Sequence, residues 1–111
     1  MPIVAKTLVE SKSVEQVQTT QYTVGVSATV LDKFTATNYS TVAQTLTVHL
    51  VPAGDMPAYS NMIVKTRTIQ PQETYTFPEL AGHILNTGDY ISTLASLTAS
   101  LNMRVSGREI S

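Results

Sequence analysis

Apolar and polar residues alternate along the stretch from Leu31 to Pro52, and this alternation constrains the fold more than any other feature of the sequence. In the run Thr45–Leu50, the apolar residues occupy the even positions and the polar residues the odd ones. Because successive side chains of a strand point to opposite faces, this pattern is typical of a half-buried β-strand. Phe34–Thr37 alternates in the same way, and the polar residues Asn38–Thr41 between the two runs favour a turn. The stretch therefore predicts a β-hairpin.

Turn residues separate short apolar runs at intervals of about ten residues along the rest of the chain, which is the spacing of an all-β domain. The runs predict seven or eight short strands in an antiparallel β-sandwich, Ig-like or jelly-roll-like. One short helix is predicted at Pro78–Leu85, because proline suits the first helical position and Leu80 and Ile84 lie one turn apart. Further strands are expected at residues 3–9, 14–24, 61–69, 74–77, 90–95 and 101–105.

The predicted strand at Asn61–Ile69 does not separate into an apolar and a polar face. Ile63 and Ile69 occupy odd positions, as do Lys65 and Arg67, so a regular strand would place all four on one face. A β-bulge or an edge position in the sheet would explain this mixture.

The chain has 111 residues, which is the size of one domain. We expect an N-terminal strand or arm at residues 1–21 and a β-sandwich domain at residues 22–111, since a terminal strand is ordered only where something ties it down. The apolar N-terminal run contains Lys6 and is too short for a signal peptide or a membrane span, which predicts synthesis in the cytoplasm. Cysteine is absent, so disulfides and thiolate metal sites are excluded.

Charged residues make up only 14% of the chain, against roughly 25% in ordinary soluble domains. The net charge of −1 gives no field for attracting phosphate backbones or anionic lipids, so nucleic acid and membranes are not expected partners. A sheet with few charged side chains is also weakly protected against association with other chains. We favour faces covered by neighbouring subunits over the alternative of a neutral polar surface without a partner.

The sequence contains no recognisable catalytic or metal-binding pattern. His49 and His83 are the only histidines, and each is expected to lie on the solvated surface, because no His, Asp or Glu residues cluster around them. The carboxylates are scattered near turns, although a paired-carboxylate site stays an alternative. No nucleotide-binding or nucleophile motif occurs. We therefore expect no catalytic residue, no metal, no cofactor and no enzymatic activity, with a small hydrolase as the least favoured alternative.

Four residues are candidates for an interface or a ligand contact: Tyr39, Met56, Tyr59 and Tyr90. Aromatic residues in small β-domains serve mostly as core and interface anchors. A stacking platform for sugars or bases is the alternative role.

Two runs of sequence are distinctive, TLTVHLVPAG at Thr45–Gly54 and QPQETYTFPEL at Gln70–Leu80. Together with Tyr22–Val24, Leu31–Asn38 and Arg104–Glu109, they resemble the small β-sandwich virion proteins of tailed bacteriophages. The resemblance leaves about the first fifth of the chain outside it.

This resemblance implies a non-enzymatic structural protein of the virion, made in the host cytoplasm. The favoured role is a capsid decoration protein that assembles on the particle as a homo-oligomer, for example a trimer, beside other virion proteins such as the major capsid protein. The alternative is a β-sandwich module of the tail, neck or fibre that binds a host glycan or receptor through tyrosines in the loops Ala53–Ser60 and Asn86–Tyr90.

Overall fold

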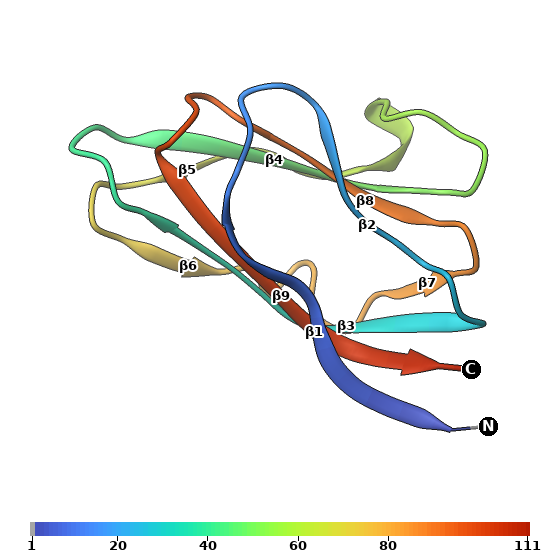
Figure 1. Cartoon of the computed structure of the whole chain (residues 1–111). Helices are drawn as coiled ribbons and strands as arrows, with labels where there is room; N and C mark the ends of the chain where they lie inside the picture. The colour runs from blue at the N-terminus through green and yellow to red at the C-terminus, as the bar shows by residue number, and fades with distance from the viewer. Residues whose placement is uncertain (1) are drawn as a thin grey trace.

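The computed structural model describes residues 2–111, which form two antiparallel β-sheets packed face to face (Figure 1). The predicted antiparallel β-sandwich is therefore confirmed. The first sheet contains, in spatial order, β1 (Ile3–Ser13), β9 (Leu101–Ile110), β3 (Ala28–Asn38) and then β6 (Thr74–Thr76), with β7 (Ile84–Asn86) also paired to β3. The second sheet contains β2 (Thr19–Thr23), β8 (Tyr90–Ala95), β4 (Gln44–Val51) and β5 (Met62–Ile69).

The core lies between the two sheets and is built from the inward-facing side chains of both. Phe34 and Phe77 are fully buried and pack edge to face, with ring centroids 5.1 Å apart. Leu46 and Val48 of β4 are also fully buried, as the alternation predicts, and Leu50 packs against the core at its margin. Burial of side chains of this size stabilises a fold by about 1.5–3 kcal/mol each.

The predicted hairpin between Leu31 and Pro52 is wrong in its pairing, although its turn is in the expected place. β3 belongs to the first sheet and β4 to the second, so residues 39–43 cross from one sheet to the other. The buried side chain of Asn38 redirects the chain here, because its Nδ2 donates to the carbonyls of Val42 and Ile69 at 2.9 and 2.8 Å. The alternation of apolar and polar residues is the same whether two successive strands pair in a hairpin or lie in opposite sheets.

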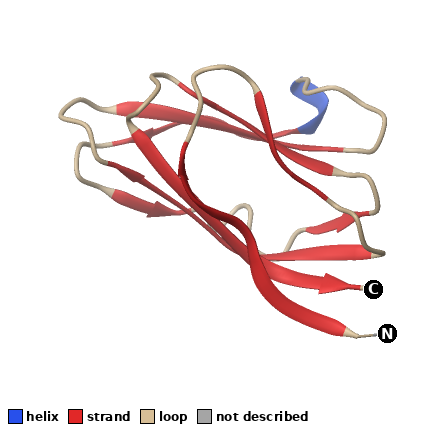
Figure 2. Cartoon of the chain, in the orientation of Figure 1, coloured by secondary structure: helices blue, strands red, loops and turns tan. Residues whose placement is uncertain are grey.

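The predicted helix at Pro78–Leu85 is also wrong. Residues 78–82 form turns, and the following residues form the short strand β7 (Figure 2). Gly82 has a left-handed φ of 89°, and its amide donates to the carbonyl of Leu31 in β3. Leu80 is fully buried whereas Ile84 is 65% exposed, so the two residues do not share a face. Backbone pairing with β3 outweighs the helical preference of this short segment.

The structure contains nine strands within residues 2–111, against the seven or eight that the sequence predicts, and the segment predicted as a helix supplies β7. In the described part of the chain, the single helical element is the 3-10 turn η1 at Tyr59–Asn61 (Figure 2). Both corrections concern segments whose conformation depends on partners distant in sequence.

Residues of the N-terminal region are paired with their own chain. β1 pairs with β9 from Ile3 opposite Ile110 to Ser13 opposite Asn102, so the two ends of the chain lie side by side (Figure 1). The segment after β1 is anchored through the Glu15 carbonyl, which accepts from the amide of Ala95 at 3.0 Å.

β5 shows both features that its mixed pattern suggests. It is an edge strand of the second sheet, and its register with β4 shifts between Leu46 and Val48. Thr66 lies at this irregularity with a positive φ of 44°, and its amide donates to Thr47 Oγ1 at 3.0 Å. The bulge reverses the parity of the strand, so that the buried residues are Val64 before it and Ile69 after it, while Lys65 and Arg67 are exposed.

A polar cluster joins the two sheets near the chain ends. The Tyr22 hydroxyl donates to Glu109 and lies 2.8 Å from Thr29 Oγ1, and Lys6 Nζ lies 3.2 Å from Glu109 Oε1. Burial raises the pKa of Tyr22 to about 12, and the adjoining carboxylate adds to the rise. The hydrogen bond from Tyr22 lowers the pKa of Glu109, and Lys6 lowers it further.

Stability at acidic pH should depend on Glu109. Because folding lowers its pKa below the ordinary value of 4.5, its carboxylate stabilises the fold above that pH, and this contribution is lost as the pH falls through the folded-state pKa. The free energy of unfolding of the native protein should therefore exceed that of Glu109→Gln near neutral pH, and the difference should shrink in acid. Urea titrations across this range measure it, and a difference that does not vary with pH would contradict the prediction.

Candidate functional site

The connection between β4 and β5, residues 52–61, folds back over the outer face of the second sheet. Its first turn is closed by a hydrogen bond from the Asp55 amide to the Pro52 carbonyl at 3.0 Å, and Gly54 supplies the required left-handed φ of 84°. The connection then passes through η1 into β5. His49 and Val51 lie on the face of β4 that points away from the core, and they are nevertheless buried, with exposures of 4% and 0%.

Asn61 holds this connection in shape. Its Oδ1 accepts a hydrogen bond from the Ala58 amide at 3.0 Å and lies 2.9 Å from His49 Nδ1, while its Nδ2 donates to the Met56 carbonyl at 2.9 Å. Asn61 is buried, at 8% exposure. One amide therefore links two points of the connection to the strand beneath it.

The turn between β7 and β8 packs against the same connection. The Tyr90 hydroxyl donates to the Asp55 carbonyl at 2.7 Å, and Asp89 Oδ1 accepts from the Ala53 amide at 3.0 Å. Gly88 approaches so closely that a Cβ atom at this position would lie 2.8 Å from the Cβ of Ala53. The two loops named in the sequence analysis thus form one continuous surface.

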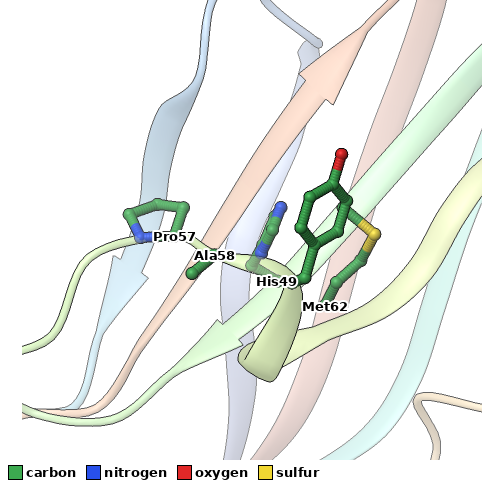
Figure 3. Close-up of a pocket in the computed structure, with 5 residues that line it drawn as sticks. His49, Pro57, Ala58 and Met62 are labelled. Carbon is green, nitrogen blue, oxygen red and sulfur yellow. The ribbon is translucent and has the colours of Figure 1, made fainter.

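A cavity of about 300 Å³ opens between the connection and the outer face of the sheet (Figure 3). Figure 3 shows the His49 ring between Pro57 on one side and Met62 on the other. Lys65 Nζ lies 5.7 Å from the centroid of the Tyr59 ring, a cation–π contact that helps to hold this exposed ring in position. The lining residues are His49, Pro57, Ala58, Tyr59 and Met62.

Three of the four candidate contact residues meet at this end of the molecule. Tyr59 and Met56 are 82% and 78% exposed, and the half-buried Tyr90 bridges the two loops. Tyr39 follows β3 at the opposite end, where its hydroxyl lies 2.8 Å from Ser13 Oγ. Along β4, about 17 Å separates Gln44, at the end nearer Tyr39, from His49 in the cavity wall.

The expectation that His49 is solvated is wrong, whereas His83 is exposed as expected. The alternation places His49 correctly on the outward face, but the connection covers that face. Pro57, Asn61 and Met62 also contribute to the site, and sequence reasoning did not select them. Their contact with His49 arises only when the connection folds over the sheet.

The chemistry of this site suits binding. His49 is hydrogen-bonded to an amide, and the cavity walls are largely apolar. Among residues 2–111, no group of three or more His, Cys, Asp or Glu side chains is placed to hold a metal ion. In the same part of the chain, no helix combines the length and the apolar character needed to cross a membrane.

No protein-family model matches the sequence, and no curated protein matches it.

Proposed function

We propose that the protein is a non-enzymatic structural protein of a bacteriophage virion, a capsid decoration protein that assembles as a homo-oligomer on the particle. The sequence runs Thr45–Gly54 and Gln70–Leu80 support the virion assignment through their resemblance to phage β-sandwich proteins. The structural observation that supports assembly into a homo-oligomer is the outer edge of β1, which pairs with no other strand of residues 2–111.

β1 is an edge strand of eleven residues that pairs with β9 on one side and, among residues 2–111, with no strand on the other. Its first residues carry exposed apolar side chains, with Ile3 at 62% and Val4 at 53% exposure. The opposite edge of the sheet consists of β6 and β7, which have only three residues each. Short edge strands resist association, whereas a long edge with apolar side chains accepts a further strand. Within the first sheet, β1 is therefore the edge that would receive a neighbouring subunit.

Val4→Asp should reduce the oligomer to smaller species without unfolding the chain. Val4 is exposed, so the charge perturbs the subunit little, but it would have to be buried in an interface along β1. Light scattering after size-exclusion chromatography measures the mass, and circular dichroism reports the fold. Val17→Asp is the matched control, since Val17 is 68% exposed and lies outside β1. A native protein that is monomeric at all accessible concentrations, or equal masses for both variants, would contradict assembly through β1.

The place in the virion is tested separately. Mass spectrometry of purified particles should detect the protein in a fixed ratio to the major capsid protein, and image reconstruction should place it on the capsid surface. Absence from complete particles would refute a virion role, while density at the tail or neck would replace the decoration role with the alternative one.

The clustering of Met56, Tyr59 and Tyr90 at one end supports the second candidate, a tail, neck or fibre module that contacts a host glycan or receptor. Exposed aromatic and methionine side chains are common at binding surfaces. Loss of host-cell binding in Tyr59→Ala, with the oligomer intact, is the result this candidate requires.

A further inference from the structure

The hydrogen bonds around Asn61 determine which nitrogen of His49 carries the proton. Asn61 Oδ1 accepts from the Ala58 amide and Nδ2 donates to the Met56 carbonyl. Reversing the side-chain amide would place Nδ2 against the Ala58 N–H, donor against donor, and Oδ1 against the Met56 carbonyl, acceptor against acceptor. Oδ1 has no hydrogen to donate. Since His49 Nδ1 lies 2.9 Å from Oδ1, Nδ1 must be the donor, and in the neutral ring Nε2 is an acceptor with a free lone pair.

This acceptor is open to the cavity. No hydrogen bond within residues 2–111 reaches His49 Nε2, and no fully enclosed side-chain nitrogen or oxygen in this part of the chain lacks a partner. Nε2 therefore has solvent contact, and we infer that it has this contact in the cavity, because His49 is one of the lining residues. His49 as a whole is 4% exposed, so only a small part of its surface borders the cavity.

The remaining lining is suited to a flat apolar group. Pro57, Ala58 and Met62 present aliphatic and thioether surface, and the exposed ring of Tyr59 borders the opening. The volume of about 300 Å³ is at the small end of the range of ligand pockets. The site thus offers one hydrogen-bond acceptor within mostly apolar walls.

We propose that this cavity binds the indole side chain of a tryptophan presented by a partner protein. An indole has one N–H donor and no acceptor, so it satisfies His49 Nε2 and leaves none of its own polar groups unpaired. A phenol would bring an oxygen that also needs a donor, and a sugar would bring several hydroxyls into apolar surroundings. The 111 residues contain no tryptophan, so none of them can supply the ring. The site does not depend on a place in the virion, because it follows from the cavity alone.

Titration of the isotope-labelled full-length protein with N-acetyl-tryptophanamide, followed by NMR, tests the proposal. We expect shift changes centred on Ala58, Tyr59 and Met62, together with a change at His49 Nε2 in long-range proton–nitrogen spectra. The same probe methylated at the indole nitrogen should bind roughly 5- to 100-fold more weakly, because it leaves the acceptor unpaired. Tyr59→Ala should weaken binding, and Tyr39→Ala, at the other end of the molecule, should leave it unchanged.

Four results would overturn the indole site: no shift change at the cavity up to the solubility limit of the probe, equal binding of the methylated probe, unchanged binding in Tyr59→Ala, or tighter binding of a methyl glycoside or N-acetyl-tyrosinamide at the same residues. None of these results depends on whether the protein is found in virions. The proposed function and the indole site can therefore fail independently.

Discussion

Replacing Val48 by aspartate should give a chain that does not fold. Val48 is fully buried on the inner face of β4, opposite Thr93 of β8 and Val64 of β5. An unpaired carboxylate buried there costs several kcal/mol, and the lost burial of valine adds about 1.5–3 kcal/mol. The sum is comparable with the total stability of a small domain, about 5–15 kcal/mol.

Circular dichroism and size-exclusion chromatography of Val48→Asp measure this effect. Val42→Asp introduces the same charge at a valine that is 62% exposed. We expect the melting temperature of this variant to be close to that of the native protein. A soluble Val48→Asp protein with the native near-ultraviolet spectrum and melting temperature would show that Val48 does not face the core from β4 as described.

Replacing Gly107 by alanine should destabilise the first sheet strongly. Gly107 lies in β9 between Lys6 of β1 and Leu31 of β3. An added Cβ would lie 2.3 Å from the Val30 carbonyl oxygen and 2.8 Å from Leu8 Cδ1, closer than real Cβ contacts occur. Because the nearer obstacle is backbone, the strands must separate to relieve the overlap. We expect a loss of about 1–3 kcal/mol in the free energy of unfolding.

Urea unfolding of Gly107→Ala measures the loss, with Gly25→Ala as the matched control. A Cβ at Gly25 meets no atom within 4 Å, so the same substitution should change stability by no more than about 0.5 kcal/mol. Equal stability of the two variants would mean that β9 does not pass between β1 and β3 as closely as described.

The positions of the strands could be predicted from the sequence because alternation is a property of neighbouring residues. Thr45–Leu50 forms β4, and the mixed pattern of Asn61–Ile69 corresponds to a bulged edge strand. Partner strands could not be predicted in the same way. Residues 39–43 cross between sheets because Asn38 bonds to Ile69, which is 31 residues away. At Pro78–Leu85, bonds to Leu31 decide against the helix.

The candidate site was predictable only in part. Met56, Tyr59 and Tyr90 were selected as aromatic or methionine residues in loops, and the structure brings them together. His49 was placed on the correct face, but its burial and its contact with Asn61 could not be predicted from its position in the alternating pattern. Exposure of an outward-facing residue depends on which loop folds over it.

The sequence by itself determined that this protein is a β-sandwich, where its strands other than β7 approximately lie, and which residues of β4 face the core, because these properties follow from the period-2 alternation of adjacent side chains. Only the tertiary structure decided that β3 and β4 lie in opposite sheets, that β1 keeps an open edge, and that His49 is enclosed beneath residues 52–61. Those features depend on contacts between residues far apart in the chain, where the local pattern gives the same signal for several arrangements.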